Sequence, residues 1–310
     1  MLIGHISRDI LAQKLRREGV HLNTGAFTTQ LQIELPDLAR EFAEMYAQYP
    51  VEDPPGIDDA RLRIGPPSLL HRYTNARAAA WMNGERVFDS VPATRAYTLL
   101  ESALNWVIAS SDVAPLVVHA GVVERQGRAL IMPAATGSGK STLCAALIWR
   151  GWRLLSDEMA AFRLEDGGLL PNPRPVSLKN KAIEVIAAFE QRARLSRTYS
   201  GTPKGNIAYM QPPPDSVSGA HASVIPALVV TPSYRVGATA TLKAMDKVEG
   251  FRLLVDNAVN YSSMLRTGFE VLTGIVERCR FYALIYSDLG AAVDLINRLE
   301  ASSGADGTSG

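Results

Sequence analysis

The chain has 310 residues, of which 47% are hydrophobic, so it can bury a substantial core in one large domain or in two. Its 32 Lys and Arg residues balance its 31 Asp and Glu residues, so its charge does not indicate nucleic acid or an anionic membrane as a partner. Two cysteines, Cys144 and Cys279, are too few for a disulfide framework or a four-ligand zinc site, and we find neither a signal peptide nor an apolar run of about 18 residues. We therefore expect a soluble, cytoplasmic protein that binds neither nucleic acid nor membrane.

The N-terminal part, residues 1–95, has the pattern of a small α/β domain. Its expected elements are strands at 27–33 and 61–64, a helix at 38–46 and a hairpin at 81–88. The dipeptide Asn83-Gly84 suits the two-residue turn of that hairpin. No catalytic constellation is visible here, so we interpret this domain as a scaffold or as a docking surface for a substrate.

A helix at 94–109 leads to residues 116–159, around which the rest of the chain is organised. Strands at 117–124 and 129–132 should form a hairpin, and a helix is expected at 142–149. Between them lies the loop Ala134-Ala135-Thr136-Gly137-Ser138-Gly139-Lys140-Ser141. A strand, a glycine-bearing loop and a helix form the context that a phosphate-binding loop requires, although Ala134 stands where the strict pattern has its first glycine.

The residue types in this loop match the chemistry of a nucleotide. Gly137 and Gly139 permit backbone conformations in which successive N–H groups point at phosphate oxygens. Lys140 would bridge the β- and γ-phosphates, and the hydroxyl of Ser141 would complete the coordination of magnesium. The residues expected to bind the nucleotide are Ala135, Thr136, Gly137, Ser138, Gly139, Lys140, Ser141 and Thr142. The alternative is a glycine-containing turn with an exposed lysine.

A strand at 152–155 ends in a pair of acids, Asp157 and Glu158. Acidic residues at the end of a strand beside a phosphate loop are where the base or the metal ligand of a phosphoryl transferase lies. The alternative is a solvated acidic turn. His119, on the strand before the loop, is by itself more typical of a core residue than of a catalytic one.

Two loops beyond the acids carry cations. The proline-rich segment 171–180 contains Arg174 and Lys179, and the segment 202–206 contains Lys204. We expect Arg174, Lys179 and Lys204 to lie near the γ-phosphate, because the transferring group spreads negative charge over three oxygens that magnesium and one lysine do not fully balance. Each could instead be an ordinary surface charge.

The remaining elements are expected to complete the second domain. They are a hairpin around 165–168, helices at 182–189, 247–260, 268–279 and 289–299, and strands at 224–231, 242–245 and 280–286. The prolines Pro226 and Pro232 near the ends of one strand favour an edge position for it. The Gly/Ser-rich tail at 301–310 is expected to be unstructured.

The run from His119 to Glu158 resembles the core of the bacterial HPr kinase/phosphorylases. That family has a histidine and a nearby glycine before the loop, a Gly-x-Gly-Lys-Ser loop, and an Arg-Gly-x-Arg-Leu strand that ends in two aspartates. This chain has His119-Ala120-Gly121, then Gly137-Ser138-Gly139-Lys140-Ser141, then Arg150-Gly151-Trp152-Arg153-Leu154. Over the full chain, with segments 174–180 and 202–205 and the N-terminal half, it looks most like the subgroup known as HprK-related kinase A.

The resemblance implies an α/β fold with an HPr-kinase-like phosphate-loop core at 96–300 and a smaller N-terminal α/β domain at 1–95. It also implies that Asp157 is the catalytic base, that Glu158 helps to hold magnesium together with Ser141, and that His119 lies beside them. Two departures matter: Glu158 replaces the second aspartate, and the Glu-x-Arg-Gly segment of the true HPr kinases is not recognisable. HPr itself is therefore not the expected substrate.

Three functions are compatible with these residues. The first is an ATP- and magnesium-dependent kinase that phosphorylates a hydroxyl, such as that of serine, on a peptide, a protein or a small molecule. The second is a non-catalytic nucleotide-binding partner protein in a biosynthetic cluster, and the third is a hydrolase with the same loop. The intact acid pair favours the kinase. A homo-oligomer is left open.

Overall fold

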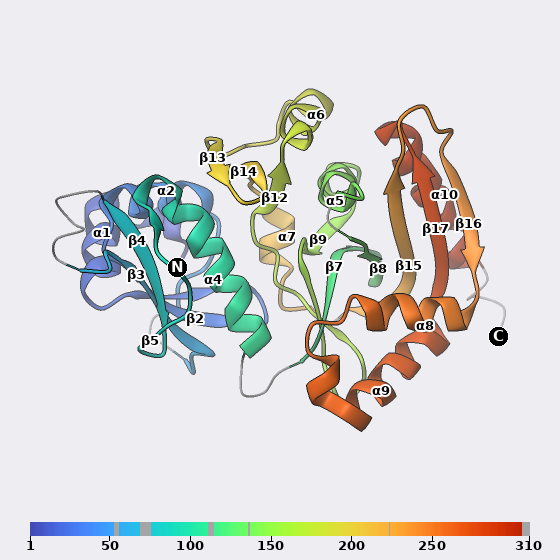
Figure 1. The fold of residues 1–310 in the computed structure, drawn as a ribbon, viewed down its shortest axis with the longest axis horizontal. Coiled ribbons are helices and arrows are strands. Elements are labelled where there is room, and N and C mark those ends of the chain that lie inside the picture. The colour runs from blue at the N-terminus through green and yellow to red at the C-terminus, as the bar shows by residue number, and fades with distance from the viewer. Residues whose placement is uncertain (53–55, 69–75, 111–114, 136, 223, 306–310) are drawn as a thin grey trace. The chain divides into compact units, whose positions relative to one another are not determined.

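The computed structural model describes residues 1–52, 56–68, 76–110, 115–135, 137–222 and 224–305. They form two compact units, each built from several stretches of the chain. Unit 1 consists of Met1–Pro115, Leu170–Ile183 and Ala193–Ala222, and unit 2 consists of Leu116–Leu169, Glu184–Arg192 and Ser223–Gly310. Both units combine helices with sheets (Figure 1), which confirms the predicted α/β class.

Unit 1 contains two sheets. Its elements are η1 (Ile3–His5), α1 (Arg8–Arg17), β1 (Val20–Asn23), β2 (Thr28–Ile33), α2 (Pro36–Met45), β3 (Ala60–Gly65), β4 (Arg77–Met82), β5 (Glu85–Arg86), β6 (Val91–Pro92), η2 (Ala93–Arg95), α4 (Ala96–Ser110), β12 (Val176–Lys179), β13 (Tyr199–Thr202), β14 (Gly205–Met210) and α7 (Pro214–Ser218). One sheet has the order β1-β2-β3-β4-β5, and the other has the order β12-β14-β13. The predicted β4–β5 hairpin is confirmed: Asn83 and Gly84 both have positive φ, as its tight turn requires.

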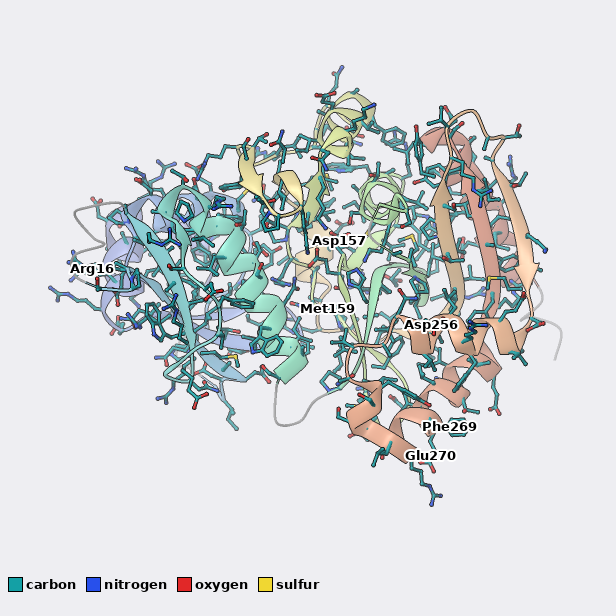
Figure 2. The ribbon with its side chains drawn as sticks, in the orientation of Figure 1. Arg16, Asp157, Met159, Asp256, Phe269 and Glu270 are labelled. Carbon is teal, nitrogen blue, oxygen red and sulfur yellow. The ribbon has the colours of Figure 1, made fainter. Side chains whose placement is uncertain are left out.

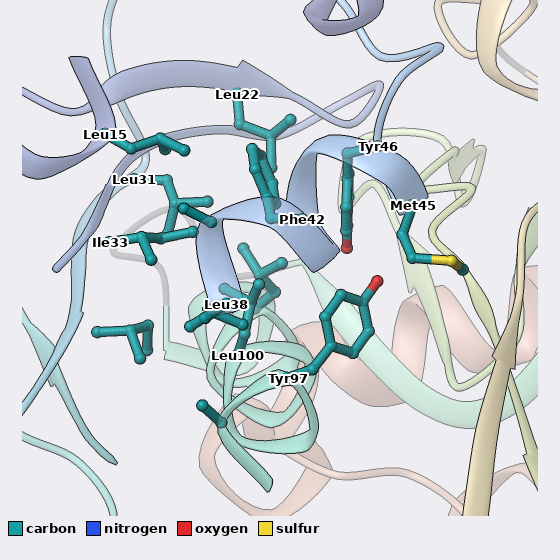
Figure 3. Packing of buried hydrophobic residues seen from close by; sticks show 14 of the residues in the cluster. Leu15, Leu22, Leu31, Ile33, Leu38, Phe42, Met45, Tyr46, Tyr97 and Leu100 are labelled. Atoms are coloured by element: carbon teal, nitrogen blue, oxygen red, sulfur yellow. The ribbon is translucent and has the colours of Figure 1, made fainter. Parts of the chain in front are cut away.

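The core of unit 1 lies between the larger sheet and the helices α2 and α4 (Figure 3). Phe42 and Leu38 of α2 pack there with Tyr97 and Leu100 of α4. The boundary predicted after residue 95 therefore differs from the one that the contacts give, because the apolar face of α4 is part of the first core. Tyr199, from the third stretch of unit 1, stacks on Tyr97 with 5.8 Å between ring centroids.

Unit 2 is built on one mixed sheet. Its elements are β7 (Leu116–Arg125), β8 (Arg128–Pro133), α5 (Lys140–Ile148), β9 (Arg153–Ser156), β10 (Met159–Phe162), β11 (Leu169–Leu170), β15 (Ile225–Tyr234), β16 (Thr241–Met245), α8 (Lys247–Asp256), α9 (Tyr261–Arg278), β17 (Arg280–Tyr286) and α10 (Leu289–Ala305), with α6 (Lys181–Phe189) starting in unit 1 and ending here. The strand order is β11-β10-β7-β8-β15-β17-β16, and β9 also pairs with β7. Strands β8, β15 and β17 run parallel, so their carboxyl ends share one edge of the sheet.

The two faces of this sheet carry different helices. Leu116, Val118 and Ala120 of β7 belong to the core that includes side chains of α8 and α9. Because successive side chains of a strand point to opposite faces, His119 points to the other face. There α5 packs against β7 and against α10. The helix that follows the phosphate loop and His119 therefore share one face.

Several expected elements differ in the structure. Strand β15 was expected at an edge but is central, because it pairs with β8 on one side and with β17 on the other. Its prolines are tolerated there: Pro226 lies at a register irregularity, and Pro232 lies beyond the last residue that pairs with β8. The proline-rich segment 171–180 contains strand β12, and the segment 202–206 contains the turn between β13 and β14 together with the ends of both strands.

Three helix boundaries also differ. Helix α8 ends at Asp256 rather than near 260, and α9 begins at Tyr261 with a break at Leu265, where φ is 47°. Residues 301–305 of the expected tail continue α10, and 306–310 lie outside the described residues. Among the described helices, none has the length and apolar character needed to cross a bilayer.

Candidate functional site

The loop between β8 and α5 is held by the carboxyl ends of β15 and β17. The backbone N–H of Tyr234 donates to the carbonyl of Ser138 at 2.9 Å, and the hydroxyl of Tyr286 donates to the carbonyl of Gly139 at 3.1 Å. In a trans peptide the C=O and the following N–H point in opposite directions. The N–H groups of Gly139 and Lys140 therefore face away from the two tyrosines.

Two glycines give this loop its path. Gly137 and Gly139 have φ of 89° and 90°, which side-chain-bearing residues rarely adopt. A Cβ atom on Gly139 would also lie 2.3 Å from the hydroxyl oxygen of Tyr286. Ala134, by contrast, is not among the described non-glycine residues with positive φ, so an alanine fits where the strict motif has its first glycine. Thr136, one of the predicted nucleotide-binding residues, lies outside the described residues.

Lys140 is the first residue of α5, and its side chain is turned toward the sheet. It is only 7% exposed, and its Nζ lies 2.9 Å from Nε2 of His119 on β7. An ammonium group can only donate, so Nε2 accepts this hydrogen bond while Lys140 is protonated. The next residues of the helix, Ser141 and Thr142, are half-buried in its first turn, where backbone N–H groups have no partner within the helix.

The acid pair lies where the chain passes from β9 to β10. Asp157 is 5% exposed and Glu158 is half-buried. The carbonyl of Glu158 accepts a hydrogen bond from the N–H of Ala120 at 3.2 Å, and Met159 is directly opposite His119 in the β7–β10 pairing. The backbone therefore places both acids beside His119, at the level at which β7 meets the end of β8.

The pKa of the buried Cys144 thiol, one turn into α5, depends on the charges around it. Burial raises its pKa well above the usual value, the charge of Asp157 raises it further, and the charge of Lys140 lowers it. The charges of Lys140 and Asp157 thus both influence this thiol, with opposite signs. Asp157 and Lys140 contribute opposite charges to one small, largely buried region.

The two other predicted catalytic cations lie in unit 1. Arg174 is buried, with its guanidinium 3.0 Å from the carboxylate of Glu101 and hydrogen-bonded to the side chain of Asn105, both on α4. Glu101 also accepts a hydrogen bond from the hydroxyl of Tyr46 at 2.8 Å. Lys204 is exposed in the β13–β14 turn. A place for Arg174 and Lys204 near the γ-phosphate stays a prediction, whereas the buried ion pair gives Arg174 a packing role within unit 1.

Sequence reasoning missed Tyr234 and Tyr286. Each is the last residue of a parallel strand, and Tyr286 is 147 residues away from the glycine that it contacts. The only signal in the sequence is an aromatic residue at the end of an apolar strand, which is common. Within the described part of the chain, no group of three or more His, Cys, Asp or Glu side chains is arranged to hold a metal ion by itself.

Comparison with known proteins finds a curated sequence relative and a set of similar solved structures. No protein-family model matches the chain. A curated HPr kinase/phosphorylase from Geobacillus sp. (strain WCH70) is 27% identical over 185 residues, so the match spans about half of each chain, 55% of this one and 55% of that protein. The solved Hpr(Ser) kinase/phosphatase from Coxiella burnetii is aligned over 60% of this chain and 98% of its own, with 14% identity and a TM-score of 0.27. The curated relative confirms the predicted resemblance to the HPr kinase/phosphorylases.

Proposed function

We propose that this chain is an ATP- and magnesium-dependent kinase that transfers the γ-phosphoryl group to a hydroxyl of a peptide, a protein or a small molecule, with serine as the favoured acceptor. The observation that carries the proposal is the group formed by Lys140 at the start of α5, His119 on β7 and the acid pair between β9 and β10. A glycine loop alone would bind a phosphate. Acids placed beside the loop lysine add the group that a phosphoryl transfer needs.

The loop fits a nucleoside triphosphate. Its N–H groups at Gly139 and Lys140 face away from Tyr234 and Tyr286, and the side chain of Lys140 brings a cation to the start of α5, against His119. Ser141 and Glu158 would hold magnesium, which commonly takes one or two protein oxygens and fills its other positions with phosphate and water. When bound, the ion would neutralise part of the charge that develops on the phosphate oxygens.

The transfer step assigns a role to each residue. The acceptor oxygen forms a bond to the γ-phosphorus, the bond from that phosphorus to the β–γ bridging oxygen breaks, and ADP leaves. Asp157 takes the proton of the hydroxyl, and Lys140 stays on the β- and γ-oxygens. His119 positions Lys140 through the contact at 2.9 Å. Because the protein does little covalent chemistry, the rate depends on this positioning.

The acceptor is proposed to differ from HPr. The curated relative carries HPr in its name, but this chain has Glu158 where the HPr kinases have an aspartate and lacks their Glu-x-Arg-Gly segment. The compartment is proposed to be the cytoplasm, and the two cysteines, which are buried and form no disulfide, support a reducing environment.

The test uses ATP labelled on its γ-phosphorus, with cell extract in one reaction and purified HPr in another. Label transferred to a component of the extract supports a kinase. Release of free phosphate alone would indicate a hydrolase, and neither product would indicate a non-catalytic binding partner. Lys140→Ala should abolish transfer, whereas Lys243→Ala, an exposed lysine of the same unit, should not change it. Near-normal transfer by Lys140→Ala would refute the phosphate-loop assignment.

A further inference from the structure

We infer that the ring of Tyr234 is the platform on which the base of the bound nucleotide stacks, an inference that rests on the proposed function. Tyr234 ends β15 beside the phosphate loop, and its side chain is 51% exposed. The other tyrosine at this edge, Tyr286, is almost fully buried and uses its hydroxyl on the loop. The two rings therefore have different surroundings, and only that of Tyr234 offers a face to a ligand.

The placement of the acids sets the direction of the nucleotide. The loop follows β8, which lies between β7 and β15 in the sheet. His119 and the acid pair lie on the β7 side, so the γ-phosphate and the acceptor belong on that side. A nucleoside triphosphate is an extended molecule with its base at the opposite end from the γ-phosphate. The base is thus directed toward β15 and β17, whose carboxyl ends lie next to each other (Figure 1).

Tyr234 is fixed close to the loop at that flank. Its N–H is bonded to Ser138, and a Cβ atom on Gly139 would lie 3.3 Å from the Cβ of Tyr234. The next residue, Arg235, donates its N–H to the carbonyl of Tyr286 at 2.8 Å. The rings of Tyr234 and Tyr286 meet edge to face, with 5.8 Å between centroids. A half-exposed ring that is already oriented loses little conformational entropy when a ligand stacks on it.

Stacking on one ring recognises the flat base rather than a particular hydrogen-bond pattern. Every base has a π-face, and a purine offers more area than a pyrimidine. Tyr234 should therefore strengthen the binding of nucleoside triphosphates over inorganic tripolyphosphate, which has the same phosphates and no base. This difference can be measured by binding alone, without an acceptor.

The experiment measures the binding of MgATP and of magnesium tripolyphosphate to the full chain by titration calorimetry. Tyr234→Ala should weaken ATP binding on the order of 10- to 100-fold and leave tripolyphosphate binding unchanged. Tyr234→Phe, which keeps the ring, should bind both as the wild type does. The matched control is Phe269→Ala on α9 (Figure 2), because Phe269 is also 51% exposed and also meets another ring edge to face, at 5.6 Å from Phe251.

Each outcome separates the inference from the proposed function. Unchanged ATP binding by Tyr234→Ala would overturn the stacking role and leave the kinase proposal intact. An equal loss for ATP and tripolyphosphate would also overturn it, because the ring would then support only the loop. Wild-type protein that binds neither ligand would refute the nucleotide site itself.

Discussion

Replacing Gly139 by alanine should be far more costly than replacing Gly137, although both glycines belong to the same loop. Their φ angles are nearly equal, 90° and 89°, so the backbone cost of an alanine, about 1–2 kcal/mol, is the same at both positions. At Gly137 a Cβ atom would meet nothing within 4 Å. At Gly139 it would lie 2.3 Å from the hydroxyl oxygen of Tyr286.

The clash adds two further costs. Displacing a buried ring from a packed site costs about 1–3 kcal/mol. Losing the hydrogen bond from Tyr286 to Gly139 costs about 0.5–1.5 kcal/mol more. Gly139→Ala should therefore lower the free energy of unfolding of unit 2 by about 2.5–6.5 kcal/mol, against about 1–2 kcal/mol for Gly137→Ala.

Urea unfolding followed by tryptophan fluorescence measures the difference. The chain has four tryptophans, of which Trp149 and Trp152 are in unit 2. In a background with Trp81→Phe and Trp106→Phe, the signal reports on that unit alone. Adding Tyr286→Phe removes the clashing oxygen and leaves the ring carbon at 3.2 Å as the nearest atom of that side chain, so the double variant should regain part of the loss. Equal costs at the two glycines, or no recovery with Tyr286→Phe, would refute this account of the loop.

Two further predictions concern the charged residues. Asp157→Asn should lower turnover by a factor on the order of 10² to 10⁴ with nucleotide affinity nearly unchanged, and Glu158→Gln should mainly raise the magnesium concentration needed for activity. Small, equal effects of both changes on turnover in steady-state assays would show that the acids form a solvated turn. Arg174→Ala should destabilise unit 1 by about 3–5 kcal/mol because it leaves the carboxylate of Glu101 buried without its cation, whereas Lys204→Ala should change the unfolding free energy by less than about 0.5 kcal/mol. Lost transfer by Arg174→Ala at unchanged stability would instead support a place at the phosphates.

Local sequence signals were sufficient for most elements and for the centre of the site. A turn such as Asn83-Gly84 determines its hairpin through the conformations of two neighbouring residues, and this hairpin is as expected. The run from His119 to Glu158 is also compact in sequence. Its residues lie on adjacent strands and one helix, so the acids at the end of a strand were expected beside the phosphate loop, and the roles of Lys140 and the acids remain predictions.

The features that sequence reasoning missed depend on distant partners. The prolines of β15 suggested an edge, but parallel pairing with β8 and β17 makes the strand central, and those partners are about 100 and 50 residues away in the chain. The ion pair of Arg174, which was expected near the γ-phosphate, was missed because nothing near Arg174 in sequence shows that Glu101 will be buried beside it. Residues such as Tyr286 enter the site in the same way, through the topology of the sheet.

The division of each unit among several stretches of the chain has a consequence for synthesis and for truncation. Unit 1 needs residues up to Ala222, since the hydroxyl of Tyr49 donates to the carbonyl of Pro173, and the side chain of Gln211 donates to the carbonyls of Glu44 and Met45. During translation the first 115 residues therefore emerge long before the segments that complete their packing. Until those segments are synthesised, part of the apolar surface of these residues stays exposed to solvent. A shortened protein cut after residue 95 or 115 would lack those segments. The smallest piece able to form unit 1 therefore carries β7, β8 and the phosphate loop with it, but not β15 and β17, which hold that loop.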